Sequence, residues 1–246
     1  MSDAPGLTHN RAYRRLHRGA GLVYFSVLEG ETDLHIGAER KLEACARQAA
    51  SEARRDVIEA IRRCPSFVTS LTPVALNDAL PVAQTMLNAT RACGVGPMAA
   101  VAGAIAQHVG KALVSAHDGD VIVENGGDIY LRCASPRVMM VYAGNSPLSN
   151  RLGLRITAPS GCGVCTSAGK VGPSLSFGRA DAAVMLADDA ALADACATAA
   201  GNLVNGEDGV QRAATFASQV PGLRGALIIC DDKMAAWGDI ELVRLG

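Results

Sequence analysis

The chain has 246 residues, of which 49% are apolar and 4% aromatic, and its formal net charge is −1. This length and apolar content are enough to bury a core. The near-neutral charge excludes a broad basic field for nucleic acid or anionic lipid, and the few aromatic residues argue against stacking platforms for single strands. We therefore expect neither a nucleic-acid partner nor a membrane partner.

Eight cysteines are spread irregularly along the chain. A disulfide framework is typical of short secreted chains, and the polar, basic N-terminus shows no apolar leader. The longest uncharged apolar run, Cys93–Ala106, is shorter than the ~20 residues that a membrane helix needs. We expect a cytoplasmic protein whose cysteines are mostly reduced and buried.

The N-terminal part of the chain predicts a hairpin followed by helices. Two apolar runs between residues 21 and 38 flank Glu29-Gly30, a turn signal. Apolar residues then recur at helical spacing over 39–63, and Pro65 ends that pattern. A second helix is expected over Pro81–Cys93, and Pro97, preceded by Gly96, is expected to open a third.

The remainder alternates between strand and helix signals. Residues 120–133 predict strand, tight turn and strand, and a loop is expected over 160–178. Further strands are expected at 138–144, 152–159, 180–188, 224–232, 234–237 and 239–246, with helices at 188–202 and 210–218. This order predicts an α+β fold with antiparallel or mixed sheets packed against helices, as one domain over 1–246 that includes the hairpin and long helix of 21–63.

The turn Asn125-Gly126-Gly127 is the first candidate ligand site. Glycines in this pattern favour positive φ and close a hairpin, so a plain turn is one interpretation. The acids Glu124 and Asp128 flank it, and glycine amides are open to a phosphate or a ring. We therefore count residues 125–128 as candidate ligand-binding residues.

The stretch Gly94-Val95-Gly96-Pro97 is the second candidate. A glycine-rich approach to a helix start leaves unpaired N–H groups that suit an anion. The stretch matches neither the dinucleotide-binding nor the P-loop pattern. A tight loop before a core helix is the alternative, so Gly94 and Gly96 are candidate ligand-binding residues on composition alone.

Asp194 and Thr198 form the third candidate, because their i, i+4 spacing places a carboxylate and a hydroxyl on one helical face. Two hard oxygens can bind Mg²⁺, with phosphates and water completing the coordination. The alternative is an exposed Asp and a threonine that bonds back to its own helix.

The fourth candidate is the stretch Ser160–Gly178, which contains Cys162-Gly163-Val164-Cys165. A zinc site would need a second ligand pair, and a thioredoxin-like site would need a helix after the motif; neither is evident. We expect a small-residue loop that offers backbone amides and the hydroxyls of Thr166 and Ser167 to a ligand. Cys165 is a candidate reactive thiol, since these amides and Lys170 would favour its thiolate. The alternative is that both cysteines are buried fillers.

Read in order, these segments resemble the ApbE-like superfamily of FAD:protein FMN transferases. The stretches GPMAAVAGAIAQHVGKAL, VIVENGGDIYL, TSAG and AALADACATAAG are similar to the family's small-residue helix, Asn-x-Gly-Gly-Asp turn, Thr-Ser-Gly loop and metal helix. The resemblance implies that Asp194 and Thr198 hold magnesium. The family's lysine-glycine pair is replaced near Ala100-Val101, and its later histidine is absent from KVGPSLSFGRADA, so transferase activity is not implied.

A closer resemblance, from about Tyr13 to Leu245, is to uncharacterised protein family 0280, a branch of that superfamily. The stretches ETDL, CGVGPMAAVAGAIA, YAGNSPLS, CTSAGKVGPSLSFGRADA, LADACATAAGN and AAWGDIELV carry it. The branch is linked with sulfide assimilation and homocysteine formation in anaerobes. The resemblance thus implies sulfur handling, with a persulfide on Cys165, Cys162 as its resolving thiol and a sulfur-transfer partner protein.

Three functional hypotheses follow. The first is the sulfur-handling protein just described. The second is a Mg²⁺-dependent flavin enzyme, with FAD or FMN as cofactor, that cleaves the FAD pyrophosphate or transfers FMN. The third is a member without catalysis that keeps a pocket for a small anionic ligand. The sequence leaves open whether the chain forms a homodimer. All three require Asn125, Thr166 and Asp194 to converge in space.

Overall fold

The computed structural model describes residues 21–169, 178–206 and 208–245. Its nine strands form one sheet in the order β1-β2-β3-β4-β5-β6-β7-β8, with β9 paired to β5. Every pairing in this sheet is antiparallel. The strands are β1 (Val23–Glu29), β2 (Thr32–Ala38), β3 (Val121–Asn125), β4 (Asp128–Met140), β5 (Leu152–Ser167), β6 (Ala182–Ala187), β7 (Leu223–Cys230), β8 (Lys233–Gly238) and β9 (Glu241–Arg244).

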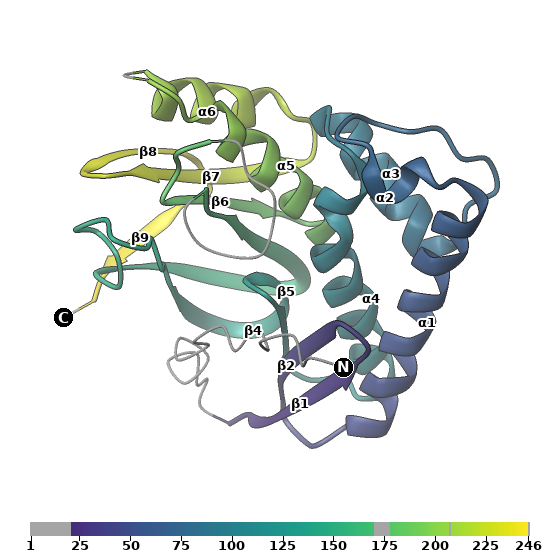
Figure 1. The fold of residues 1–246 in the computed structure, drawn as a ribbon. Helices are drawn as coiled ribbons and strands as arrows, with labels where there is room; N and C mark the ends of the chain where they lie inside the picture. Colours follow the sequence, from purple (N-terminus) through teal and green to yellow (C-terminus); the bar gives the residue numbers. More distant parts are fainter. Residues whose placement is uncertain (1–20, 170–177, 207, 246) are drawn as a thin grey trace, which may run out of the picture.

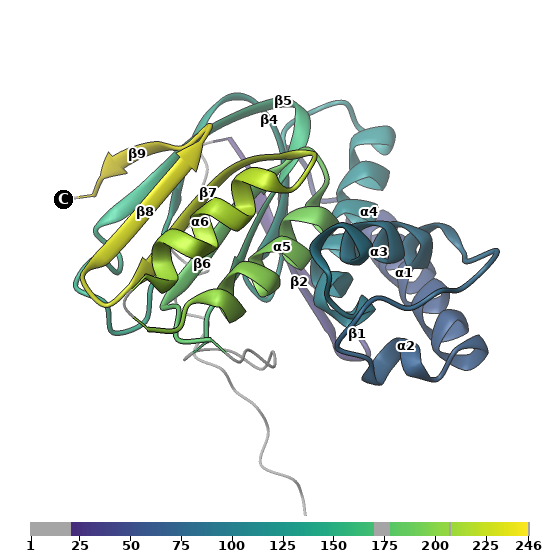
Figure 2. The same cartoon turned by 90° about the horizontal axis from the view of Figure 1, so that it is seen from above.

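The helices form two groups on the sheet. In Figure 1, α5 lies over β5 and β6, and α6 lies over β7 and β8. Helix α4 packs on β3 and β4 and α1 on β1, while α3 packs against α5 and the neighbouring helices; Figure 2 shows this arrangement from above. The helical elements are α1 (Glu43–Arg63), α2 (Ser66–Thr69), α3 (Pro81–Cys93), the 3₁₀ turn η2 (Pro97–Ala100), α4 (Val101–Ala116), α5 (Ala190–Leu203) and α6 (Gly209–Gln219). The prediction of an antiparallel α+β fold is therefore confirmed.

Most predicted elements occur where the sequence places them. The hairpin turns after Glu29, the second helix spans Pro81–Cys93, and Pro97 stands at the first helical position after Gly96. The long helix begins at Glu43 instead of residue 39. The helix opened by Pro97 starts as a 3₁₀ turn before α4.

The expected loop over Ser160–Gly178 is wrong for its first part. Residues 160–167 complete β5: residues 162–164 pair with β4 on one side, and residues 163–167 pair with β6 on the other. Gly163 explains why small residues stand in a buried strand: a Cβ there would lie 2.3 Å from Ala190 Cα, so the glycine lets α5 approach β5. Residues 170–177, with Lys170, lie outside the described residues.

Both faces of the sheet carry an apolar core. The larger core lies between the sheet and the helices, and it includes Met185 and Ile228. The smaller one lies on the opposite face and includes Leu131, Leu154 and Leu227. Because successive side chains of a strand point to opposite faces, residues three apart in β5 contribute to different cores.

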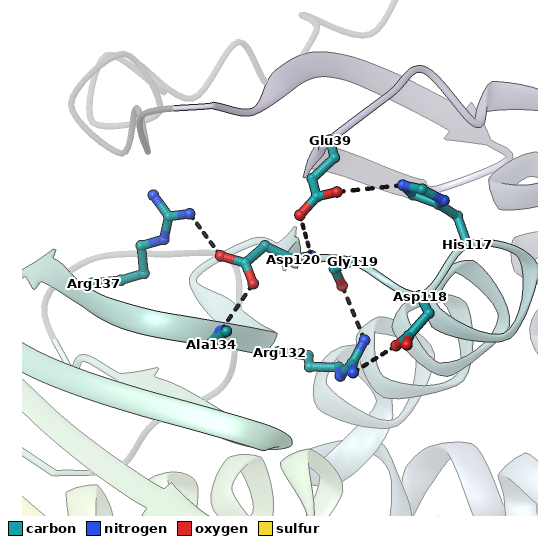
Figure 3. Close-up of polar contacts among 8 residues, drawn as sticks. All are labelled: Glu39, His117, Asp118, Gly119, Asp120, Arg132, Ala134 and Arg137. Atoms are coloured by element: carbon teal, nitrogen blue, oxygen red, sulfur yellow. Dashed lines mark hydrogen bonds and ion pairs between the residues drawn. The ribbon is translucent and has the colours of Figure 1, made fainter.

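A polar network fastens the α4–β3 connection to β4 (Figure 3). Asp120 Oδ1 accepts from Ala134 N at 2.9 Å, and its Oδ2 accepts from Arg137 at 2.7 Å. Burial alone would raise the pKa of Asp120, but the hydrogen bonds from Arg137 and Ala134 outweigh it and the pKa is lowered. Arg132 pairs with Asp118 at 2.6 Å beside this cluster.

Glu39 extends the same network to the end of β2. Its Oε1 accepts from Asp120 N at 3.2 Å, and its Oε2 lies 3.4 Å from His117 Nε2. The connection between α4 and β3 is thus held from both sides, which fixes where the β3–β4 hairpin begins.

Among the described residues, no single helix combines the length and the hydropathy of a membrane span. Helix α3 and the η2–α4 segment meet that test only as a pair, which is bent by 104°.

Candidate functional site

The turn Asn125–Asp128 joins β3 to β4 as a two-residue hairpin, as the sequence predicts. Gly126 and Gly127 have φ of 69° and 108°, conformations that favour glycine. Asn125 Nδ2 donates to the Ala102 carbonyl at 3.1 Å. The side chain of Asn125 therefore binds the turn to the start of α4.

Asp128, at the first position of β4, lies against the end of β5. Its Oδ1 accepts from Thr166 N at 3.3 Å, and its carboxyl lies beside the Cys165 thiol. Burial raises the pKa of Asp128 to about 7, and the charge of Glu124 adds to the rise. Glu124 Oε1 accepts from Gly127 N at 2.9 Å, so this turn amide points to the protein.

Asp194, on α5, is 8% exposed and caps α4 from outside that helix. Its Oδ2 accepts from Gly103 N at 2.8 Å, and the Ala102 amide also binds the carboxyl. Burial, followed by the charge of Asp128, raises the pKa of Asp194 well above its usual range despite these amides. Two acids from separate elements, the partly buried Asp128 and the buried Asp194, therefore repel one another.

Helices α4 and α5 cap each other reciprocally. Gln107 Oε1, on α4, accepts from Ala190 N at 2.8 Å, while Asp194 on α5 accepts from Gly103 N. On each helix, the side chain that accepts a hydrogen bond lies four residues after the backbone amide that donates one to the other helix. Asp189 completes the α5 terminus: its Oδ1 accepts from Leu192 N at 3.0 Å and its Oδ2 from Gln107 Nε2 at 3.3 Å. The arrangement fixes the position of Asp194 relative to α4.

Thr198 and Ser167 lie further along the same two elements. Thr198, one turn after Asp194 on α5, is partly exposed. Ser167 is buried at the end of β5, and a Cβ at Gly201 would lie 3.5 Å from its Oγ. The end of β5 therefore runs beside the C-terminal half of α5, with Thr166 partly exposed beside Asp128.

The structure explains Gly94 and Gly96 by backbone conformation and packing. Gly94 ends α3 in the left-handed region with φ of 72°. A Cβ at Gly96 would lie 1.8 Å from the Ser70 carbonyl oxygen, so this glycine permits close packing of two backbone segments. None of the hydrogen bonds described above for Asp128 and Asp194 involves either glycine.

The structure thus brings five candidate residues together: Asn125 and Asp194 bind the start of α4, while Asp128 lies beside Cys165 and Thr166 of β5 and its charge acts on Asp194. The convergence that the sequence requires is present.

Comparison with known sequences identifies the family. Residues 14–234 match the family model described as "AbpE bacteria". The chain is 41% identical to a UPF0280 protein of Methanothrix thermoacetophila, over 95% of this chain and 94% of that one. It is also 41% identical to a UPF0280 protein of Methanosarcina barkeri, over 87% and 85% of the two chains. The chain belongs to the UPF0280 family.

Solved structures show which fold this UPF0280 protein shares. The ApbE protein of Thermotoga maritima is similar with a TM-score of 0.56 at 11% identity, over 87% of this chain and 96% of that one. The flavin transferase ApbE from Vibrio cholerae is similar with a TM-score of 0.50 at 13% identity, over 88% and 96%. At such identities the likeness shows an ApbE-like fold and nothing about activity.

The C-x-x-C motif of this UPF0280 protein is not a redox pair. Cys165 belongs to the core under the helices and Cys162 to the core on the opposite face of the sheet. Residues three apart in a strand are separated by about 10 Å, beyond the reach of a disulfide. The expectation that Cys162 resolves a persulfide on Cys165 is therefore wrong.

The expectation of a Cys165 thiolate is also wrong for this structure. Cys165 has no exposed surface, and its thiol donates to the Ala190 carbonyl at 3.3 Å. Burial, followed by the charges of Asp128 and Asp194, raises the pKa of the thiol well above its ordinary value. Burial also raises the pKa of Cys162 to about 12.

Sequence reasoning missed Gln107 and Asp189, which position α5. Gln107 is 5% exposed and stands alone as an amide among apolar residues of α4. Asp189 directly precedes an alanine-rich helix, a typical N-cap pattern. The N-cap role of Asp189 could have been predicted from the sequence. The role of Gln107 is apparent only from its contact with Ala190.

A further group of ligand atoms was also missed, at the β7–β8 turn. Oxygen or sulfur atoms of Asp181, Cys230 and Asp231 all lie within 4.8 Å of one another. Asp181 Oδ2 accepts from Asp231 N at 2.6 Å. The group lies at the opposite end of β6 from the Asp194 helix start, since Asp181 precedes β6 and α5 follows it.

Proposed function

We propose that this protein binds a divalent cation at Asp128, Asp194 and Thr198 and uses it to hold a small anionic ligand. The observation that carries the proposal is a buried acid of α5, Asp194, beside a partly buried acid of β4, Asp128, close enough that the charge of Asp128 raises the pKa of Asp194. Two neighbouring carboxylates that are largely shielded from solvent are stabilised when a proton or a cation lies between them.

The donors suit a hard cation. Carboxylate and hydroxyl oxygens are the ligands that Mg²⁺ prefers, and Mg²⁺ commonly takes one or two carboxylates plus the phosphates of its ligand. Asp194 and Thr198 lie one turn apart on α5. A bound cation would neutralise phosphate charge and orient a phosphoryl group. The amides of Ala102 and Gly103 hold the Asp194 carboxyl in place for this role.

The anionic ligand is proposed to be a nucleotide-like phosphate ester, and its place is beside the partly exposed Thr166 and the Asn125–Asp128 turn. This keeps FAD or FMN as the ligand class to test, because the Vibrio cholerae protein is named a flavin transferase. Cleavage of the FAD pyrophosphate or transfer of FMN is the finer form of this hypothesis.

Thermal unfolding tests the cation site. A ligand that binds only the folded state raises the unfolding temperature with its concentration. Mg²⁺ and Mn²⁺ are expected to raise the Tm of the wild type at pH 8, but not that of Asp128→Asn or Asp194→Asn. Asp118→Asn is the matched control, because its side chain is 86% exposed and remote from this site. An equal rise in all four proteins would overturn the proposal. FAD added with Mg²⁺, with AMP as the product sought, then tests the finer hypothesis.

Sulfur handling is the second candidate, and one contact supports it. The Cys165 thiol lies beside the Asp128 carboxyl, whose pKa of about 7 suits a proton acceptor near neutral pH. The hypothesis requires α5 to move, since Cys165 is completely covered. It predicts that an inorganic polysulfide transfers one sulfane sulfur to Cys165, with the shortened polysulfide as leaving group, and that mass spectrometry finds this persulfide on wild type and not on Cys165→Ser. A persulfide yield unchanged by the substitution would remove the hypothesis and with it the sulfur-transfer partner protein.

A further inference from the structure

Strand β8 is the last strand in the order of the sheet, on the side of α6 (Figure 1). Within the part of the chain that the structure describes, β7 is its one neighbouring strand, and its other edge is open. The backbone N–H and C=O groups along an open edge can pair with another extended chain. β8 therefore offers a template for the addition of a strand.

A hydrogen bond of β7 shows which residues of β8 face the open edge. Ile229 O accepts from Asp181 N, on the side of β6, at 2.9 Å. Ile229 is the register partner of Met234, and in an antiparallel ladder the backbone groups of successive residues point to alternate sides. The N–H and C=O groups of Met234 and Ala236 consequently point away from β7, toward the open edge.

A groove of about 270 Å³ follows this edge between β8 and α6. The helix contributes Gln211, Thr215 and Ser218 to it, and the strand contributes residues 234–237. Met234 is 43% exposed, and Trp237, the one tryptophan of the chain, is partly exposed. Large apolar side chains beside an open strand edge indicate a surface that another chain covers.

We propose that a second copy of this chain covers the edge, with the two β8 strands antiparallel across a two-fold axis at Ala236. A two-fold contact uses the same patch on both copies, so the strand has to be complementary to itself. The facing residues of β8 meet this requirement in size and in charge. The dimer does not depend on the proposed cation site.

Side-chain size is complementary in this register. Met234 faces Gly238 of the second copy, which leaves room for the methionine. Trp237 faces Ala235 of the second copy, so a large side chain again meets a small one. Ala235 and Trp237 pack on the helix side of the sheet, and the groove beside α6 therefore receives Trp237 of the second copy.

Charge is complementary in the same register. Lys233 begins β8 and is exposed, while Asp239 directly follows β8 and has a side chain that is 67% exposed. Each Lys233 lies opposite Asp239 of the second copy, so the axis forms this pair twice. Opposite charges at facing positions stabilise a strand pair, and like charges there destabilise it. A register centred on Ala235 would place Lys233 opposite Trp237 and lose both ion pairs.

Sedimentation equilibrium of the full chain, over a hundredfold range of concentration, tests the dimer. The wild type is expected to reach twice the monomer mass at the upper end. Ala236→Pro removes an N–H that faces the open edge and spares the ladder with β7, so it should weaken the dimer at least tenfold while the fold is kept. Leu28→Pro is the matched control, on the other edge strand β1, and should dimerise as the wild type does.

Exchange of the two charges tests the register. Lys233→Glu and Asp239→Lys each place like charges opposite one another in their own dimer, so each protein alone should dimerise about tenfold more weakly. A mixture of the two restores opposite charges in both pairs and should form a heterodimer about as tightly as the wild type. Far-UV circular dichroism of each variant checks that it is folded.

The wild type decides even if a variant fails to fold. A wild type that stays monomeric over the whole range would overturn the proposal, and the edge would then suit a different partner. A folded Ala236→Pro that dimerises as tightly as the wild type would overturn it too, because the interface would lie elsewhere. Cation binding is measured separately, so a monomeric wild type leaves the proposed function intact.

Discussion

Gly103 N donates to Asp194 Oδ2 at 2.8 Å, so an acid of α5 caps the first turn of α4. This contact gives Asp194 a structural role besides the proposed cation site, and substitutions can separate the two. Asp194→Asn keeps an oxygen for the Gly103 amide and removes the charge. Asp194→Ala removes both the cap and the charge.

We therefore expect Asp194→Asn to unfold near the wild-type urea midpoint without cation, and Asp194→Ala to lose about 1–2 kcal/mol of unfolding free energy, the usual cost of a lost cap. Both should lose the response to Mg²⁺. Urea denaturation with and without Mg²⁺ measures this. If Asp194→Asn retained the Mg²⁺ response, the charge would not be part of the site.

Gln107, on α4, should likewise contribute to the stability of the folded protein through its contact with α5. Gln107→Ala leaves the Ala190 amide and Asp189 without their partner and should cost about 1–3 kcal/mol, the penalty of a buried group left unsatisfied. Gln107→Glu keeps an acceptor for Ala190 N but places a carboxylate beside that of Asp189. Its stability should fall as pH rises, whereas Gln107→Ala should show no added pH dependence. Denaturation midpoints of the two variants from pH 5 to pH 8 test this.

Asp128 should make the cation-free protein less stable as pH rises. Its pKa is raised from an ordinary value near 4 to about 7, so the folded state keeps a proton that the unfolded state releases. The Asp128 contribution is fully favourable below pH 4 and is lost as pH rises to about 7. Asp128→Asn should flatten this slope in unfolding free energy, and saturating Mg²⁺ should do the same for the wild type. A wild-type slope unaffected by Asp128→Asn would contradict the assignment.

Asp120 should make the protein more stable as pH rises, which is the opposite of the effect of Asp128. Arg137 and the Ala134 amide lower its pKa, so its contribution to stability is present above pH 4 and is lost as pH falls through the lower folded pKa. Asp120→Asn should thus reduce stability at pH 6 and have little effect near pH 2. Urea midpoints at the two pH values measure the difference, with the exposed Asp118 as control.

A structural feature of this protein can be predicted from the sequence when neighbouring residues alone determine it. The β3–β4 turn is predictable because two glycines must adopt positive φ, and the start of the 3₁₀ turn is predictable because Pro97 fits the first helical position. Residues 160–167 were mistaken for a loop, since small residues without alternation carry no strand signal. They become strand because α5 packs on Gly163, which is a tertiary contact.

The candidate site shows the same division. Asp194 and Thr198 are predicted from their spacing, and Asn125 and Asp128 from the turn; their roles stay predictions. The state of Cys165 cannot be read locally: the sequence suggested activation by amides and Lys170, whereas α5 covers the thiol and two acids face it.

Direct titration with Mn²⁺ at pH 8, by calorimetry on the wild type and on Asp128→Asn, Asp194→Asn and Asp118→Asn, tests the central claim most directly. The account predicts one saturable Mn²⁺ site per chain in the wild type and in Asp118→Asn, and at least a tenfold weaker site in the other two. Equal binding in all four, or no binding by the folded wild type, would contradict it.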